Sequence, residues 1–374
     1  MKIGFDATPL LRDLSGIGFV AYSQAKELIK SEELEFFYAW FWSDKLRERP
    51  LGAYEKSVEF VKRYIPRPYI LTHSLKSAIF NIGIVTKKLD VFYQPNYITF
   101  PMIKNVPIVT TVHDLSHIRF PEYHPKDRVD HYTKNLKNSL KRSAKVIAIS
   151  EFTKSELLYF NLCEEDKIEV IYNGIDERFR PIEDLGSLYR YALQKQNYFL
   201  FVGTLEPRKN LKTLLRAYLL LFEKYGESLP DLAIVGNIGW NSELFDDILQ
   251  QALKNQKVKK LGYVPSEDLP LLYSGAKAFI LPSFYEGFGL PVIEAMACGT
   301  PVICSDNSSL KEISGDGAML VKSNSIDSIS IAIEKILEDS LICEDLIKKG
   351  FEIKKKFSWK DNGRKLIKTF ESAQ

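Results

Sequence analysis

Short runs of β-branched and aromatic residues alternate along the chain with stretches of helical periodicity. This alternation is typical of βα units around parallel sheets, in which buried strands are joined by helices that cover the sheet. In the first half the pattern predicts strands at residues 2–6, 35–42, 91–94, 108–113, 145–150 and 168–172. In the second half it predicts strands at residues 198–203, 232–236, 258–263, 278–282 and 301–304.

A polar, weakly patterned segment separates the two halves. It follows Asn173-Gly174 and continues to Gln196, after which strands and helices alternate again. A chain of 374 residues also exceeds what a single core usually supports. We therefore expect an α/β protein with two doubly wound Rossmann-like domains facing across a cleft, residues 1–180 and 181–356. Open α/β sheets bind ligands at the carboxyl ends of their strands, so the cleft is the expected site.

Helical stretches are predicted from Asn210, over residues 291–297 and after Ser325. A further helix is predicted after Ser266, which Glu267 and Asp268 follow. A serine hydroxyl can cap free N–H groups, and acidic residues are favourable at the positive end of a helix dipole. Ser266 is therefore the expected cap of that helix.

Composition excludes several classes of protein. The chain is 45% hydrophobic and 26% charged, which is ordinary for a globular protein. Its longest strictly apolar run, Phe36 to Trp42, is far shorter than the roughly 20 residues of a membrane-spanning helix. The amino terminus turns acidic at Asp6 and lacks a secretory pattern, so we expect a cytoplasmic protein. Four cysteines without a C-x-x-C pair are interpreted as small buried hydrophobes: Cys163, Cys298, Cys304 and Cys343.

The net charge of +3 is too small to indicate a nucleic-acid partner, and no nucleic-acid-binding motif is present. Basic residues are nevertheless concentrated between Lys45 and Lys88, where aromatic residues accompany them. Cations with interfacial aromatics suit an anionic membrane surface or a lipid-diphosphate acceptor. We expect a peripheral contact of this segment with the inner face of the membrane, and an ordinary solvated surface is the alternative.

The most informative stretch covers residues 282–301 and has the sequence PSFYEGFGLPVIEAMACGTP. A predicted strand ends at its start, a glycine-containing loop follows, and Pro291 suits a first helical position. The loop brings Glu286 and free backbone N–H groups to a helix amino terminus, which favours an anion or a hydroxyl-rich ligand. Glu294 lies about one turn into the helix, so both carboxylates can accept hydrogen bonds from sugar hydroxyls.

This E-x7-E stretch with its G-F-G-L-P core resembles the donor-binding signature of glycosyltransferase family 4, the retaining sugar transferases with a glycosyltransferase-B fold. Three further pieces stand in the family's order: Ser15-Gly16-Ile17-Gly18, Val112-His113-Asp114, and GTLEPRKN at residues 203–210. The resemblance covers essentially the whole chain.

The resemblance implies roles for individual residues. Arg208 and Lys209 would clamp the donor diphosphate and stabilise the leaving nucleotide without a metal. Lys209 is expected to be a surface cation that contributes little to stability. Glu286 would hold the transferred sugar, His113 would contact it, and Glu294 would hold the ribose. The other implied donor-binding residues are Gly16, Gly18, Tyr263, Val264, Gly287, Phe288, Gly289 and Leu290.

The stretch TVHDLSHIRFPEYHP at residues 111–125 resembles the mannosyltransferase branch of this family. It implies transfer of mannose from GDP-mannose, with retention, to a glycan or lipid-linked saccharide in cell-surface polysaccharide biosynthesis. In this family the usual proposal is front-face attack, in which the departing phosphate oxygen takes the acceptor proton. UDP-sugar donors, a sugar-nucleotide 2-epimerase of the same fold and a non-catalytic sugar-binding protein are the alternatives.

Two other patterns suggest different chemistry. The run from Gly16 to Ala21 matches the dinucleotide pattern G-x-G-x-x-G/A, but nine residues separate it from the strand end at Asp6, which disfavours a dehydrogenase. Four histidines crowd the region that includes His113. Zinc motifs of this spacing lie on helices, whereas residues 115–125 are expected to form a loop, so no metal is predicted. The other three are interpreted as structural: His117, His124 and His131. No D-x-D pair occurs, and no cofactor is expected.

The fold that the resemblance implies has an acceptor-binding first domain, residues 1–180, and a nucleotide-sugar donor-binding second domain, residues 181–356. Its final helix crosses back to the first domain. Residues 361–372 carry a narrow apolar stripe of Leu366, Ile367 and Phe370. We expect residues 357–374 to pack on the first domain, so that two crossings form a hinge that closes over the donor. A helix packed only on the second domain is the alternative.

Overall fold

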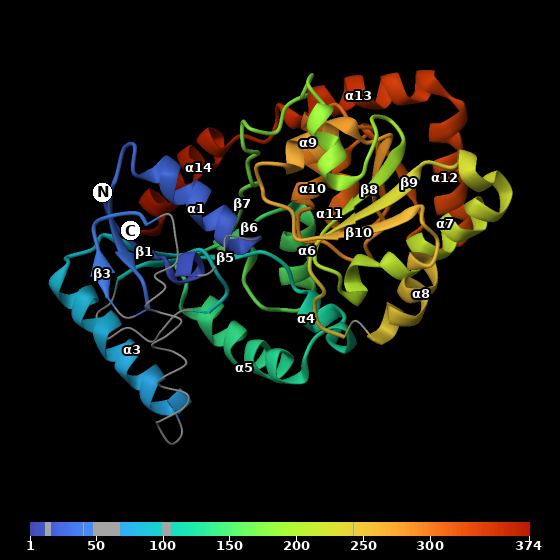
Figure 1. Cartoon of the computed structure of the whole chain (residues 1–374). Coiled ribbons are helices and arrows are strands. Elements are labelled where there is room, and N and C mark those ends of the chain that lie inside the picture. Colours follow the sequence, from blue (N-terminus) through green and yellow to red (C-terminus); the bar gives the residue numbers. More distant parts are fainter. Residues whose placement is uncertain (12–15, 40, 48–67, 99–105, 242) are drawn as a thin grey trace.

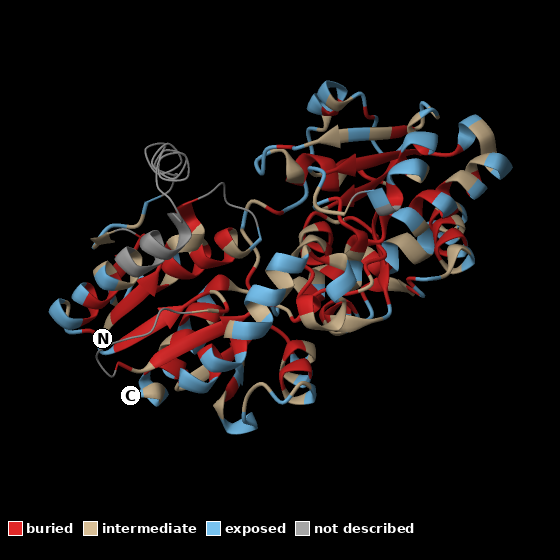
Figure 2. Cartoon of the chain, turned by 90° about the horizontal axis from the view of Figure 1, so that it is seen from below, coloured by how far each residue is buried: buried red, intermediate tan, exposed pale blue. Residues whose placement is uncertain are grey.

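The computed structural model describes residues 1–11, 16–39, 41–47, 68–98, 106–241 and 243–374, without the side chains of residues 68–75 and 244. Two α/β domains, each built on one sheet, lie side by side (Figure 1). The inner strands of both sheets are buried and the surrounding helices expose their outer faces, as Figure 2 shows. The predicted fold class is confirmed.

The first sheet has the strand order β3-β2-β1-β4-β5-β6-β7, and its neighbours are parallel except for the antiparallel pair β2 and β3. In chain order its strands are β1 (Lys2–Asp6), β2 (Glu33–Phe37), β3 (Trp42–Ser43), β4 (Val91–Gln94), β5 (Ile108–Val112), β6 (Lys145–Ala148) and β7 (Ile168–Val170). The prediction of one strand over 35–42 is wrong. The chain turns at Ala39, whose φ is +62°, and Tyr38 N–H donates to the carbonyl of Phe41.

The second sheet has the order β10-β9-β8-β11-β12-β13 and is parallel throughout. In chain order its strands are β8 (Tyr198–Val202), β9 (Asp231–Val235), β10 (Val258–Gly262), β11 (Ala278–Leu281), β12 (Val302–Ser305) and β13 (Ala318–Val321). The strand β13 was not predicted from the sequence. The strand order reverses between β8 and β11, and ligands of doubly wound sheets bind outside the carboxyl ends of the strands at such a reversal.

Helices cover both sheets. In the first domain they are α1 (Ile17–Leu28), α3 (Pro68–Thr86), α4 (Ser116–Arg119), α5 (Lys126–Arg142) and α6 (Glu151–Tyr159). In the second they are α7 (Leu211–Tyr225), α8 (Glu243–Leu253), α9 (Leu269–Gly275), α10 (Leu290–Ala297), α11 (Ser308–Ser314), α12 (Ile326–Glu338) and α13 (Ser340–Lys354).

Two local predictions are wrong. Ser266 does not cap a helix, because α9 begins three residues later and the Ser266 hydroxyl accepts a hydrogen bond from Arg178 instead. Residues 115–125 are not purely a loop, since they contain α4 and the 3-10 turn Pro121–Tyr123.

The last helix, α14 (Trp359–Ala373), lies on the first domain beside α1 (Figure 1). Leu366 and Phe370 are fully buried there, and the Phe370 ring is 5.2 Å from that of Tyr93. The chain thus passes between the domains near Ile175 and again near Ser358, where these two residues form a parallel bridge. The boundary near residue 180 stays a prediction.

Candidate active site

Two loops meet where the second sheet reverses its strand order. One follows β8 and covers residues 203–210, and the other follows β11 and covers residues 282–289. Asn210, in the left-handed conformation, donates from Nδ2 to the carbonyls of Pro282 (2.9 Å) and Ser323 (2.6 Å). Phe284 N–H donates to the carbonyl of Arg208 at 2.9 Å. These bonds fix the two loops against each other.

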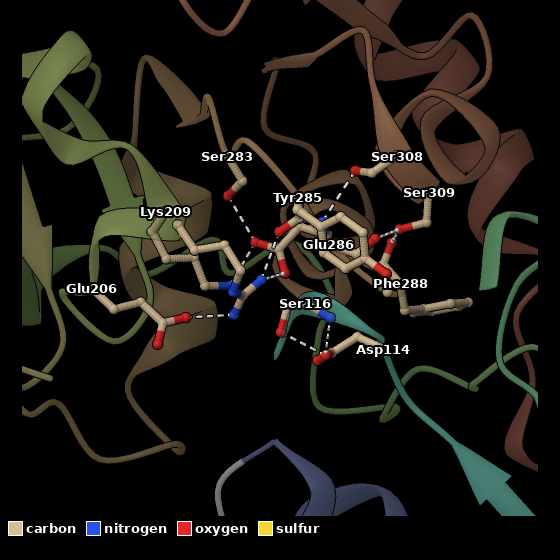
Figure 3. Close-up of polar contacts among 12 residues, drawn as sticks. Asp114, Ser116, Glu206, Lys209, Ser283, Tyr285, Glu286, Phe288, Ser308 and Ser309 are labelled. Atoms are coloured by element: carbon tan, nitrogen blue, oxygen red, sulfur yellow. Dashed lines mark hydrogen bonds and ion pairs between the residues drawn. The ribbon is translucent and has the colours of Figure 1, made fainter. Parts of the chain in front are cut away.

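The paired loops hold a buried group of charged side chains (Figure 3). Glu286 Oε1 lies 2.6 Å from Lys209 Nζ, and Glu286 Oε2 lies 3.0 Å from an Arg208 nitrogen. Ser283 Oγ donates to Glu286 Oε1 at 2.7 Å, and Arg208 also donates to Glu206 Oε1 at 2.5 Å. Together with Asp114 of the first domain, which interacts electrostatically with Arg208, these charged residues form the ion cluster: Asp114, Glu206, Arg208, Lys209 and Glu286.

Charge pairing keeps Asp114, Arg208 and Glu286 ionised despite their burial. Burial acts to raise the pKa of Glu286, but Lys209 and Arg208 outweigh it and hold that pKa below its usual value. Burial acts to lower the pKa of Arg208, but Glu286, Glu206 and Asp114 together raise it. Burial likewise opposes ionisation of Asp114, yet Arg208 helps to lower its pKa to about 2. Glu286 is therefore a hydrogen-bond acceptor at neutral pH, suited to sugar hydroxyls.

Lys209 departs from the expectation of a surface cation. The residue is buried, because its ammonium pairs with Glu286 and its methylenes lie near Gly203. Removing one partner of a buried ion pair typically costs about 3–5 kcal/mol. Lys209 therefore contributes to folding stability as well as to the charge of the site.

The loop at residues 282–289, called the donor loop below, contacts the first domain through the segment after β5. A Cβ atom built on Gly287 would lie only 1.7 Å from the carbonyl oxygen of His113, so this contact requires glycine. The Tyr285 hydroxyl accepts a hydrogen bond from Leu115 N–H at 3.0 Å. The His113 imidazole donates from Nε2 to the carbonyl of Pro95 (2.8 Å), and burial lowers its pKa. The site is thus assembled from both domains.

Glu294 belongs to a second polar group, on α10. Its Oε2 accepts a hydrogen bond from the hydroxyl of Tyr273 at 2.9 Å. Burial raises the pKa of Glu294 to about 7, against the opposing effects of this hydrogen bond and of Arg178. Glu286 and Glu294 therefore stand on either side of the start of α10 in different electrostatic environments.

The remaining predicted donor-binding residues lie at three places. Gly16, with φ of +48°, precedes α1, and the space beside its Cα is open, while Gly18 is buried within α1. Tyr263 is 69% exposed and its neighbour Val264 is buried. Three residues lie at the start of α10: Phe288, which is buried and precedes the helix, Gly289, its N-cap with φ of +101°, and Leu290, its first residue.

Several residues that position the donor loop were missed by sequence reasoning. Ser309 Oγ donates to the carbonyls of Glu286 (2.8 Å) and Phe288 (2.9 Å), and Ser308 Oγ accepts from Glu286 N–H at 3.1 Å. From the first domain, Ser150 and Thr153 hydroxyls donate to the carbonyl of Gly287 at 2.7 and 3.2 Å. A polar residue at the carboxyl end of a predicted strand, as Ser150 is at the end of residues 145–150, was the signal available in the sequence.

Within the described ranges, no group of three or more histidine, cysteine, aspartate or glutamate residues is arranged to hold a metal ion. In the same part of the chain, no helix is both long and apolar enough to cross a membrane.

Two doubly wound domains with a buried arginine, lysine and glutamate at the strand reversal define a glycosyltransferase with the glycosyltransferase-B fold. The family model Glycosyltransferase Family 4 matches residues 14–179, and the model Glycosyl transferases group 1 matches residues 190–353. The chain belongs to glycosyltransferase family 4.

Individual relatives of the chain are also named as glycosyltransferases. The chain is 33% identical over 385 residues to O-antigen chain mannosyltransferase B of Escherichia coli, covering 99% of this chain and 100% of that protein. It is 32% identical over 240 residues to O-antigen chain mannosyltransferase RfbU of Salmonella typhimurium, covering 64% and 62%. The structure of Anabaena HepE in complex with UDP-glucose superposes with a TM-score of 0.75 at 19% identity, over 100% of both chains.

Proposed function

We propose that this glycosyltransferase transfers mannose from GDP-mannose, with retention of configuration, to a glycan or lipid-linked saccharide during polysaccharide synthesis. The observation that carries the proposal is the ion cluster at the strand reversal of a chain with full-length similarity to an O-antigen mannosyltransferase. Two adjacent cations next to an ionised carboxylate suit a sugar diphosphate, in which anionic phosphates adjoin hydroxyl groups.

In this proposal each residue acts on one part of the donor. Arg208 and Lys209 stabilise the charge that develops on the departing diphosphate, and such groups are typically worth about 3 kcal/mol each. Glu286 accepts hydrogen bonds from the transferred sugar, and Glu294 accepts them from the ribose. The phosphate oxygen that departs takes the proton of the attacking hydroxyl on the same face of the sugar. The proposal includes no metal ion, because Arg208 and Lys209 supply the cationic contacts to the phosphates.

A panel of GDP- and UDP-sugars tests the donor by thermal stabilisation of the protein. A ligand at a hundred times its dissociation constant adds about 2.7 kcal/mol to the unfolding free energy. We expect GDP-mannose to raise the melting temperature most. Stabilisation by UDP-sugars alone would favour a UDP-sugar donor instead. Release of free UDP from a UDP-sugar without any acceptor would favour the 2-epimerase.

We also propose that the segment Lys45–Lys88 contacts an anionic membrane surface. Residues 48–67 and the side chains of 68–75 lie outside the described residues. On the described part of α3, Ile82 and Val85 are exposed, which gives this helix an apolar outer face. Binding to phosphatidylglycerol vesicles should weaken steeply with salt, since attraction fades within a Debye length of about 8 Å at physiological ionic strength. Equal binding to neutral vesicles would reject this contact.

A further inference from the structure

Two buried histidines near the ion cluster have ring nitrogens that lack hydrogen-bond partners among the described residues. His117 lies in α4 and is 4% exposed, and His124 follows the 3-10 turn Pro121–Tyr123 and is 7% exposed. The unpaired atoms are His117 Nε2 and both nitrogens of His124. Buried polar atoms nearly always have hydrogen-bond partners in folded proteins. Three such nitrogens close together therefore indicate a place where a ligand could supply the missing hydrogen bonds.

The unpaired atoms continue into the ion cluster. Asp114 interacts electrostatically with both histidines, and Arg208 does so with His124. Arg208 Nε and Glu206 Oε2 are also buried without a hydrogen-bond partner. Unsatisfied donors and acceptors therefore extend from the first domain to the residues proposed to hold the donor diphosphate. An acceptor hydroxyl must reach the transferred sugar, so unpaired groups next to the ion cluster are candidates for binding the acceptor.

Aromatic rings surround the same histidines. The rings of Tyr132 and Tyr97 lie 5.1 and 6.1 Å from His117, and the ring of Trp240 lies 5.8 Å from His124. Arg128 lies over two of these rings, with its guanidinium 4.9 Å from the centre of Trp240 and 5.7 Å from that of Tyr132. Aromatic faces next to hydrogen-bonding groups suit a sugar ring, which has apolar C–H faces and a rim of hydroxyls, and a sugar that uses these faces must displace the Arg128 guanidinium. Trp240 comes from the second domain and donates from Nε1 to the carbonyl of Tyr123 at 2.7 Å.

The protonation state of the histidines indicates whether their ligand is a hydroxyl group or an anion. Burial, helped by the nearby Arg128 and opposed by Asp114, lowers the pKa of both, that of His124 to about 4, so both imidazoles are neutral at pH 7. A neutral imidazole offers one donor and one acceptor, and a hydroxyl group needs both. A phosphate would instead favour protonated rings. The chemistry therefore selects the uncharged saccharide portion of an acceptor.

We propose that His117 and His124 bind hydroxyl groups of the acceptor saccharide and that Trp240 contacts a face of its ring. The saccharide enters this site when the hydrogen bond from Trp240 Nε1 to the carbonyl of Tyr123 breaks. This inference rests on the proposed glycosyltransfer and assigns its acceptor side. It replaces the interpretation of His117 and His124 as structural residues. The site takes a neutral pyranose, whichever carrier the saccharide is attached to.

Histidine-selective isotope labelling tests the site on the full chain. The sequence has five histidines, so the imidazole NMR signals can be assigned by single substitutions. The probes are α-linked mannobiose and a panel of neutral galactose and N-acetylglucosamine disaccharides, added to enzyme saturated with GDP. We expect at least one disaccharide to shift the signals of His117 and His124 saturably while exposed His131 stays unchanged. No saturable shift with any of them, or shifts with inorganic phosphate alone, would overturn the proposal.

Kinetics with the disaccharide that gives the largest shift provide the second test. His124→Phe keeps a flat ring but removes both nitrogens, and we expect it to raise the acceptor KM about tenfold or more, with GDP-mannose affinity little changed. His124→Gln should recover part of the loss, and His131→Phe is the matched control. An unchanged acceptor KM in His124→Phe, or equal losses toward donor and acceptor, would contradict a role in acceptor binding.

Calorimetric titration of the same wild-type sample with GDP-mannose keeps the two proposals separate. Absent GDP-mannose binding would refute the proposed donor, whatever the histidine signals do. Normal GDP-mannose binding with unmoved histidine signals would refute the acceptor site alone.

Discussion

Replacing Gly287 with alanine is expected to prevent the two domains from closing around the donor loop. The new Cβ would lie 1.7 Å from the carbonyl oxygen of His113 and 2.9 Å from Asp114 Cβ. Neither obstacle can rotate away, because one is backbone and the other is the first atom of a side chain. The φ of Gly287 lies outside the left-handed region, so alanine adds this clash without backbone strain.

The size of the effect follows from these distances. Because real Cβ atoms do not approach other heavy atoms closer than 3.0 Å, the two segments must separate by about 1.3 Å or more. A misplacement of about 1 Å between reacting groups can lower turnover roughly 100-fold. The hydrogen bonds from Ser150 and Thr153 to the Gly287 carbonyl would lengthen as well. Each domain keeps its own core, so both should stay folded.

The assay compares turnover, GDP-mannose affinity and thermal melting of Gly287→Ala with those of wild type. We expect turnover to fall about 100-fold or more while the protein stays folded. Gly186→Ala is the matched control, since the atom nearest to its added Cβ is the carboxylate oxygen of Asp184, at 3.1 Å. Turnover of Gly287→Ala close to that of wild type would refute the argument that this contact assembles the site.

Three further predictions concern charge. Lys209→Ala should lower turnover about 10²–10³-fold. Because its ion pair with Glu286 is buried, the substitution should also lower the free energy of unfolding by about 3–5 kcal/mol. Normal turnover of the folded variant would contradict the assignment. Burial raises the pKa of Glu294 from 4.5 to about 7. Between these pH values the folded state keeps a proton that the unfolded state has lost, so the free energy of unfolding falls as the pH rises. Glu294→Gln should remove that decline in urea melts recorded across pH, and identical profiles would be evidence against it. Activity should survive saturating EDTA; loss that manganese or magnesium restores would show that a metal takes part.

Much of the fold could be predicted because each parallel strand is a short apolar run next to a helical pattern. The prediction failed where such a run hides a turn. The aromatic residues 36–42 include no glycine, proline or asparagine, yet Ala39 adopts a left-handed conformation and the chain reverses into β3. The segment Ala318–Val321 was missed because Val321 is its only β-branched or aromatic residue, whereas the predicted strands are rich in such residues.

The core of the site could be predicted because Arg208, Lys209 and Glu286 follow strands that are neighbours in the second sheet. Burial of Lys209 could not be predicted, since it depends on how the two loops pack. Contacts between the domains were also out of reach. Trp240 and Tyr123 are 117 positions apart, and Ser150 and Gly287 are 137 apart, so only the folded chain brings them together.

The most direct test of the account is an NMR time course of GDP-mannose with a mannose-terminated saccharide acceptor, for wild type and Glu286→Gln. We expect GDP and a new α-mannosidic linkage to appear in equal amounts, and Glu286→Gln to form both far more slowly. A β-linked product, GDP release without transfer, or a Glu286→Gln variant as fast as wild type would contradict it.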